Sequence, residues 1–498
     1  MNQIKLRGIV AAVSGALLMG AMPAMADSTD DIVNALMAKG VLTEEEGALL
    51  MKGRQGEKEA AEEKKKSEVK AAFKDGLVFE SGDKSFKAQI NGRVHADYRA
   101  FDYNEGKNNA APAGAGNSIA NVTNLPDTFD IRRARVGFKA NYKEYYDVEV
   151  VADVANTTTL DVGYLNVAWW KPVQFRFGQF KMPMNLEELT SSNNIDFMER
   201  SYVNQLAPAK EIGAMVHGTP FKGVTYALAL SNGNAKNAET DMREDGKDII
   251  GRVTANFAEI MDNKDMVLHA GVAYSKGDLS LPAAATTVGV AGRTEARGAT
   301  FFSAPIVTRA AGQGDNVDRS RLGLEGAVAY GPFKVQAEWM RLSNEFSTAT
   351  RSYDLDTKNW YAEALWTITG ESYADIYKGG VFGGIKPKND FDPKTFKGGA
   401  WEVGLRVSKF DASDYNTAGV GQGNGTDAQV TTKARGFEEA RTYTAGIKFL
   451  PNSNMRFMLN YVQTDFDNAI GGASGGILVN NQREDSERAV LMRAQWMF

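Results

Sequence analysis

Charged side chains recur at every second position along several stretches of this 498-residue chain. Successive side chains of a β-strand point to opposite faces, so charges spaced by two would line one shared surface. Charges at a constriction of a water-filled passage decide which ions enter it, although a lumen of mixed charge needs no dedicated ligand at any single arginine. The candidates are the basic residues Arg93, Arg133, Arg135, Lys139, Arg176, Arg321, Arg406, Lys448 and Arg493, and the acidic residues Glu149, Glu325, Glu338, Glu363 and Glu402.

The opposite face of the same stretches is apolar. From Lys84 onward, Phe86, Ile90 and Val94 occupy one register while Arg93 and His95 occupy the other. Such alternation over about ten residues is typical of a membrane barrel strand, with lipid outside and water inside. Sixteen runs of this kind lie near 84–100, 128–141, 145–154, 159–170, 173–180, 211–218, 222–231, 248–258, 266–275, 321–330, 333–342, 358–369, 400–409, 441–449, 455–464 and 487–498.

The connections between the runs alternate in length, as expected for outer-membrane barrels with long external loops and short periplasmic turns. Short turns include Lys171-Pro172 and Gly331-Pro332. Two connections break the rule, since 155–158 is short and 370–399 is long on the turn side. We predict long loops near 101–127, 181–210, 232–247, 276–320, 343–357, 410–440 and 465–486.

The N-terminal part differs from the barrel runs. Residues 1–26 resemble a cleaved signal peptide, with Lys5 and Arg7 before an apolar run and a small-residue site at Ala24-Met25-Ala26. The sequence of 27–75 predicts a short periplasmic helical segment, in which Gly40 ends one helix and Thr43 caps another. Two interpretations stay open for it, a solvated helix or linker and a coiled-coil oligomerisation stalk. The fold class is therefore an all-β membrane protein, a 16-stranded antiparallel transmembrane β-barrel over 76–498 preceded by that helical segment.

Composition excludes several classes of function. Cysteine is absent and the formal charge is −5, so thiolate metal sites, covalently attached c-type haem and nucleic-acid binding are not expected. Only His95, His217 and His269 could serve as imidazole bases, and none lies in a nucleophile motif, so we expect no enzymatic activity and no cofactor. A remaining alternative is a barrel that acts as a sleeve around a partner such as a multihaem cytochrome.

The connection 181–210 carries apolar residues that a solvent-facing loop would not need. Met182, Met184, Leu186, Phe197 and Met198 predict a loop that folds inward against the barrel wall and narrows the pore. The segments FGQFKMPMNLEELTSSNNIDFMERS, WYAEALWTITGES, VFGGIKPKNDFDP and FLPNSNMRFMLNYVQTDFD resemble the phosphate-selective porins O and P.

The resemblance covers most of the chain beyond about Gly76 and implies a homotrimeric outer-membrane porin. In that family the third loop folds into the pore, and phosphate-specific members guide small anions along an arginine ladder to a basic constriction. Guanidinium and ammonium groups suit this task because they form charge-assisted hydrogen bonds with oxyanions. The anion-binding residues that we expect here are Arg132, Arg133, Arg135, Arg176, Lys181, Arg200 and Lys210.

Overall fold

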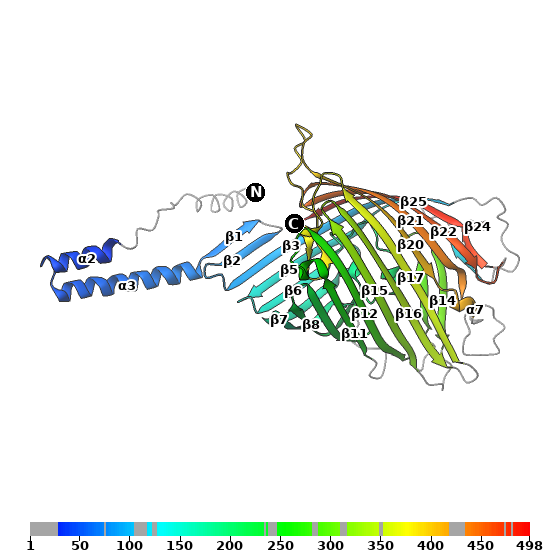
Figure 1. Ribbon diagram of the computed structural model, residues 1–498, viewed down its shortest axis with the longest axis horizontal. Helices are drawn as coiled ribbons and strands as arrows, with labels where there is room; N and C mark the ends of the chain where they lie inside the picture. Colours follow the sequence, from blue (N-terminus) through cyan, green and yellow to red (C-terminus); the bar gives the residue numbers. More distant parts are fainter. Residues whose placement is uncertain are drawn as a thin grey trace, which may run out of the picture. The chain divides into compact units, whose positions relative to one another are not determined.

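The fold was analysed in a computed structural model, which describes residues 28–73, 76–103, 117–121, 127–233, 236–237, 247–280, 287–308, 316–347, 352–417, 434–472, 475–479 and 482–498. Sixteen antiparallel strands pair in chain order around a ring (Figure 1). They are β3 (Phe86–Tyr103), β5 (Thr128–Tyr142), β6 (Tyr146–Asp153), β7 (Thr159–Trp170), β8 (Val173–Lys181), β9 (Lys210–Phe221), β10 (Val224–Ser231), β11 (Asp248–Asn256), β12 (Met266–Ser280), β15 (Asn316–Tyr330), β16 (Phe333–Ser347), β17 (Ser352–Thr367), β20 (Ala400–Asp411), β21 (Arg435–Asn452), β22 (Met455–Ala469) and β25 (Ser486–Met497).

The ring closes between its first and last strands. In the register of β3 and β25, Tyr103 lies opposite Glu487 and Arg93 lies opposite Met497. Closure leaves no unpaired sheet edge in the hydrocarbon, where an unsatisfied backbone amide would cost several kcal/mol. The predicted sixteen-stranded barrel is therefore confirmed, with one strand at each of the sixteen predicted runs.

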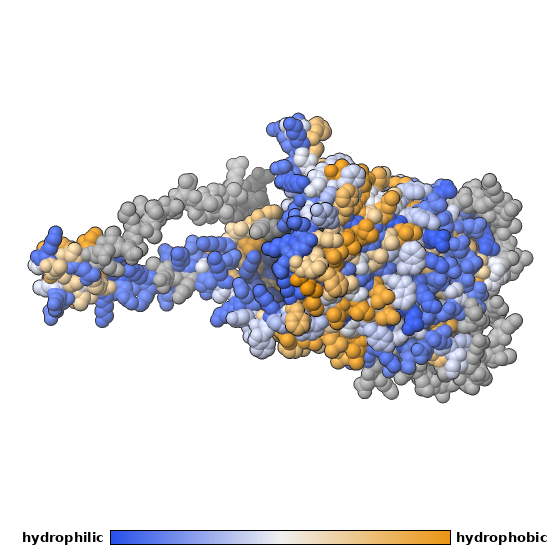
Figure 2. Space-filling view, viewed as in Figure 1, coloured by the Kyte–Doolittle hydropathy of each residue, from blue (hydrophilic) through white to orange (hydrophobic). Residues whose placement is uncertain are grey.

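The two faces of the wall differ as the alternation predicts. Outward side chains such as Val136, Phe138 and Leu405 are exposed, whereas inward ones such as Arg133 and Glu363 are buried. A hydropathy map shows an apolar band across the outside of the wall with a hydrophilic zone beside it (Figure 2). This band matches what the hydrocarbon core of a membrane requires of a barrel.

Two of the β-bulges between barrel strands affect the charges of the lumen. Between β3 and β5, His95 lies opposite Arg133 and Ala96 opposite Ile131, so Arg132 is an extra residue. Between β6 and β7 the register shifts in the same way at Asp161. A bulge re-aims a side chain, and here each bulge places an additional charged residue on the lumen side.

Several predicted loops contain more strand than the sequence suggests. The prediction of a long loop at 343–357 is wrong. Strand β16 continues to Ser347 and β17 begins at Ser352, so most of this range belongs to the two strands. The side chains at these strand ends are mostly polar on both faces, so the apolar alternation that identifies a strand in the sequence ends before the strand does. The other connections contain β4 (Asn117–Asn121), β13 (Thr287–Arg293), β14 (Thr300–Thr308), β18 (Tyr377–Lys378), β19 (Val381–Phe382), β23 (Gly475–Val479), β24 (Gln482–Glu484), α4 (Leu186–Leu189), α5 (Val203–Leu206), α6 (Phe257–Ile260), α7 (Asp414–Thr417) and the 3₁₀ turn η1 (Ala374–Ile376).

A separate unit contains the helices α2 (Ser28–Ala38) and α3 (Glu44–Ser67). Gly40 adopts a left-handed φ of 69° after α2, as its predicted role in ending that helix requires. Thr43 and Glu46 form the predicted capping box at the start of α3. The strands β1 (Val69–Phe73) and β2 (Leu77–Ser81) follow, so the helical prediction runs too far beyond Ser67.

The predicted signal peptide, residues 1–26, lies outside the described residues. Among the helices that the structure describes, none is both long enough and apolar enough to cross a bilayer.

Candidate functional site: a basic cavity in the barrel lumen

The connection 181–210 lies inside the barrel. Met182, Met184, Leu186, Phe197 and Met198 are each no more than 2% exposed. Burial of side chains of this size is worth about 1.5–3 kcal/mol each, which favours the inward position of the loop. The predicted inward fold is therefore confirmed, and we call residues 181–210 the inner loop.

The inner loop packs against an acidic part of the wall formed by β16, β17 and β20. Glu338 on β16 accepts hydrogen bonds from the backbone N–H groups of Leu186 (3.0 Å) and Glu187 (2.7 Å) at the start of α4. On the same strand, the Lys334 ammonium lies 2.6 Å from the carboxylate of Asp196 in the loop. These contacts hold two points of the buried part of the loop, at the start of α4 and at Asp196, against β16.

Arg406 on β20 joins the inner loop to a second loop. Its guanidinium lies 2.6 Å from Glu295, in the turn between β13 and β14, and 3.3 Å from Glu187. Glu295 also accepts a hydrogen bond from the backbone N–H of Tyr202 (3.0 Å). A buried arginine with two carboxylates satisfies charges that would otherwise be costly to remove from water.

Glu199 of the inner loop is surrounded by arginines of the wall. Its carboxylate lies 2.7 Å from Arg132, 2.9 Å from Arg99 and 3.5 Å from Arg493. Burial alone would raise the pKa of Glu199, but these guanidinium groups outweigh it and hold the pKa well below its usual range. Beside this group, Arg133 is buried, and its Nε and Nη1 have no hydrogen-bond partner among the described residues.

Two predicted anion-binding residues instead contact the backbone of the inner loop. Lys181 donates to the carbonyl oxygens of Glu188 and Thr190, the latter at 2.9 Å. Arg200 donates to the carbonyl oxygens of Glu187 (3.0 Å) and Thr190 (2.9 Å). These carbonyls lie at the C-terminal end of α4, where a helix leaves acceptors unsatisfied and where cations are favourable.

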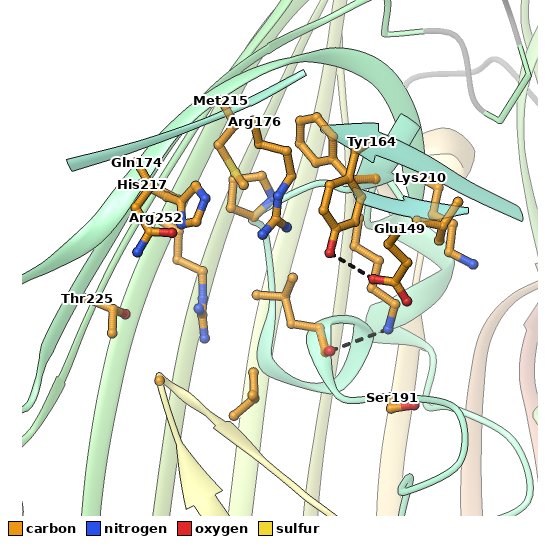
Figure 3. Close-up of a pocket in the computed structure, with 18 of the residues that line it drawn as sticks. Glu149, Tyr164, Gln174, Arg176, Ser191, Lys210, Met215, His217, Thr225 and Arg252 are labelled. Carbon is orange, nitrogen blue, oxygen red and sulfur yellow. Dashed lines mark hydrogen bonds between the residues drawn. The ribbon is translucent and has the colours of Figure 1, made fainter. Parts of the chain in front are cut away.

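On the opposite side of the lumen a cavity of about 590 Å³ remains open between β3, β5–β11 and the inner loop. Figure 3 shows Arg176, Tyr164, His217, Lys210 and Glu149 directed into it. The carboxylates in the lining are Glu149 and Asp161. The cations in the lining are Arg93, Arg135, Lys139, Arg176, Lys181, Lys210 and Arg252.

Most of these cations have a carboxylate partner. Asp161 lies 2.7 Å from Arg135 and 2.6 Å from Lys210, so the bulged residue of β7 neutralises two predicted candidates. Lys139 pairs with Glu149 (3.3 Å), Lys181 contacts Glu188 (3.9 Å), and Arg252 pairs with Glu325 (2.5 Å).

Arg93 and Arg176 are the exceptions, since neither contacts a carboxylate among the described residues. Arg93 donates to the hydroxyl of Ser192 at 3.1 Å. The guanidinium of Arg176 lies 4.2 Å from the ring centroid of Tyr164, and its Nε lies 3.4 Å from the side-chain oxygen of Asn166. These two arginines therefore give the cavity its excess of positive charge.

The long connection 370–399, on the side of the short turns, also contributes to the lumen through the β18–β19 hairpin. The tip of the β18–β19 hairpin, Gly379 and Val381, lines the cavity, and Arg252 donates to the carbonyl of Gly380 at 3.1 Å. Tyr377 contacts the Nδ1 of His269 through its hydroxyl at 2.7 Å. Sequence analysis missed this insertion, although apolar residues in a turn are the same signal that revealed the inner loop.

The three histidines have structural neighbours. His95 lies 3.3 Å from the amide oxygen of Asn193, His217 lies 2.8 Å from that of Asn166, and His269 lies 2.9 Å from Glu325. In the part of the chain that the structure describes, no cluster of histidine and carboxylate side chains could hold a metal ion.

A closed barrel of sixteen strands with an apolar outer band, a loop folded into its lumen and an open polar cavity is an outer-membrane porin. The sequence profile of the family "Phosphate-selective porin O and P" matches residues 88–498, so the chain belongs to that family. It therefore forms a water-filled channel of the outer membrane for passive diffusion of small hydrophilic solutes.

Porin O of Pseudomonas aeruginosa is 27% identical over 453 residues, covering 85% of this chain and 91% of the relative. Among solved structures, an anion-selective porin from Comamonas acidovorans has 12% identity and a TM-score of 0.46, covering 83% of this chain and 100% of its own. The channel DcaP of Acinetobacter baumannii has 9% identity and a TM-score of 0.47, covering 83% and 98%.

Proposed function

We propose that this porin prefers anions, with oxyanions such as phosphate among its solutes. The observation that carries the proposal is the charge of the open cavity, where Arg93 and Arg176 have no carboxylate partner in the described chain. Charges that line a narrow aqueous passage raise the local concentration of counter-ions and exclude ions of like charge.

The net charge of the whole chain, −5, does not oppose this proposal. Several lumen carboxylates are engaged in contacts with or within the inner loop, since Glu338 accepts from its backbone amides and Glu187 and Glu295 pair with Arg406. A solute in the cavity meets the basic side of the lumen. The name of the family agrees with an anionic solute.

Within this proposal the basic residues divide into four roles. Arg176, together with Arg93, contacts the permeating anion. Arg135 and Lys210 contribute a weaker field because Asp161 lies between them, and Arg132 and Arg133 extend the basic surface beyond the cavity beside Glu199. Lys181 and Arg200 position the inner loop through its carbonyl groups.

We also propose that residues 1–26 are removed as a signal peptide and that the mature chain forms a homotrimer in outer-membrane lipid, with 27–75 in the periplasm. The small residues at Ala24 and Ala26 support cleavage. Exposed apolar side chains on α3, such as Leu49 at 76%, support association of the helical segments in a coiled coil.

The sleeve alternative has no support, because the inner loop and the β18–β19 hairpin occupy the lumen that a partner would need. Enzymatic function also gains no support from the family, whose members named here are channels.

The test is the reversal potential of the purified protein in planar bilayers under a KCl gradient. Anion preference is expected, and Arg176→Gln and Arg93→Gln should each reduce it. The exposed Arg441 on β21, which points outward, provides the matched control, Arg441→Gln. A wild-type channel that prefers cations would overturn the anion proposal and leave the porin assignment intact. A conductance that saturates with phosphate concentration would indicate a phosphate-binding site in the channel. A conductance that rises linearly would indicate simple diffusion of phosphate.

A further inference from the structure

The lining of the basic cavity is not uniformly polar. Val151, Val162, Tyr164, Leu189 and Met215 contribute apolar surface beside the cations. A small hydrated ion such as inorganic phosphate gains nothing from such surface, because its oxygen atoms need only hydrogen-bond donors and charge. Apolar walls stabilise a solute only when the solute carries apolar atoms that leave water on binding.

The size of the cavity supports the same conclusion. Its volume of about 590 Å³ lies within the range of about 300–1,000 Å³ that is typical of sites for small organic molecules. Such sites combine apolar lining with polar groups that fix orientation, and this cavity places Val151, Leu189 and Met215 beside its cations. One inorganic oxyanion would fill a small part of this space.

Arg176 has the geometry of an orienting group. Its guanidinium lies over the Tyr164 ring at 4.2 Å, and the Tyr164 hydroxyl donates to Glu149 at 2.8 Å, so the ring itself is held in place. Only the Nε of Arg176 has a hydrogen-bond partner, Asn166 at 3.4 Å, among the described residues. The Nη groups stay available for the two oxygens of a carboxylate, which a guanidinium binds in a bidentate manner.

The apolar part of such a solute would meet a neighbouring surface. Met215 lies on β9 directly opposite Arg176 in the strand register, and Figure 3 shows the two side chains together on the cavity side. Methionine adapts to apolar groups of different shape and makes favourable contacts with aromatic rings. The acidic group and the ring of an aromatic carboxylate could therefore be bound by adjacent strands.

We propose that the cavity is a binding subsite for organic monocarboxylates with an apolar body, in which Arg176 binds the carboxylate while Tyr164, Met215 and Val151 contact the apolar part. This inference rests on the proposed anion preference and adds that the channel discriminates among anions by their apolar surface. It assigns a specificity to the side of the lumen that the inner loop leaves open.

The experiment compares block of single-channel chloride current by benzoate with block by acetate and by phosphate. Benzoate shares its carboxylate with acetate and differs by the ring, so tighter block by benzoate isolates the apolar contribution. We expect half-block at a benzoate concentration about tenfold below that of acetate. Equal block by benzoate and acetate would overturn the subsite.

Two variants separate the roles of the charge and the apolar surface. Arg176→Gln should weaken block by benzoate about tenfold, because it removes the charge-assisted hydrogen bonds. Met215→Gln preserves all charges, so it should weaken block by benzoate by a larger factor than block by acetate. Weakening of benzoate and acetate block to the same extent in Met215→Gln would contradict the assigned apolar contact.

The reversal potential distinguishes failure of this inference from failure of the proposed function. An anion-preferring channel without selective benzoate block would refute the subsite alone. A cation-preferring wild-type channel would refute the anion preference on which the subsite rests.

Discussion

Two sides of one lumen carry different charges and have different environments. On the side formed by β16, β17 and β20, Glu338 and Arg406 contact the inner loop and are buried. On the side formed by β3 and β5–β11, Arg93 and Arg176 face an open cavity. Both sides arise from the same alternation of polar and apolar residues.

The difference shows that the charge of a pore depends on which lumen residues a loop covers. A carboxylate that binds loop amides, as Glu338 does, is removed from the path of a solute. Arg176, which lies over the ring of Tyr164, stays available to a permeating solute. The net charge of the chain sums the covered and the accessible charged residues, so it says little about the ion preference of the pore.

Replacing Arg406 with alanine should have the largest effect on this comparison. The change leaves Glu187 and Glu295 buried without their partner, which typically costs about 3–5 kcal/mol. Urea unfolding of the barrel in detergent would measure the loss. Arg176→Ala is the matched control and should cost about 1 kcal/mol or less, because Arg176 has an aromatic contact and no ion pair with any residue that the structure describes. Equal losses would remove the distinction between the covered and open sides.

Reversing the charge of Arg176 should have the next largest effect, and it acts on selectivity. At 4 Å in water each unit of charge alters the energy of an ion by about 1 kcal/mol, so the two-unit change in Arg176→Glu should lower the anion-to-cation permeability ratio by about tenfold or more. Reversal potentials in a KCl gradient measure this ratio. Arg441→Glu, on the outward face, should leave the ratio unchanged.

Replacing Asp161 with asparagine should sharpen the comparison in the opposite direction. Asp161 lies within 2.7 Å of both Arg135 and Lys210, so Asp161→Asn frees two cations beside the cavity. The permeability ratio should rise by about threefold or less, because the amide keeps an acceptor for one of them. Asp465→Asn, at an outward position of β22, is the control. A fall in the ratio would contradict the role assigned to Asp161.

The smallest effect is expected from a change outside the barrel wall. Thr43→Ala removes the hydroxyl that accepts from the Glu46 backbone, which typically costs a helix about 1 kcal/mol. Amide hydrogen exchange in the first turn of α3 should become faster. Conductance and reversal potential should stay at their wild-type values, and a change in either would show that this cap affects the channel.

The sequence predicted the strands well because each membrane strand must satisfy two solvents at once. Lipid on one face and water on the other enforce a period of two, as in Val136 and Phe138 against Arg135 and Lys139. The inward fold of the inner loop was also predictable, because its methionines would otherwise meet water.

The partners of the lumen charges could not be predicted in the same way. Alternation assigns a residue to a face without saying what lies opposite, so the pairing of Arg135 with Asp161 required the bulge in β7. Lys181 and Arg200 matched the family segment, but their contacts with loop carbonyls depend on the conformation of α4. The β18–β19 hairpin was not predicted, because alternation identifies the wall strands and says nothing about where the long connection 370–399 between two of them folds.

The pairing of β3 with β25 also bears on how the protein assembles. Gly92 and Phe498 exchange backbone hydrogen bonds of 2.9 and 3.0 Å across this seam, although about four hundred residues separate them in the chain. Contacts so distant in sequence form slowly because of the large loop-closure entropy. Until they form, both terminal strands expose an edge that can pair with another chain. Folding therefore requires another surface that covers the unpaired edges of β3 and β25 until these two strands pair.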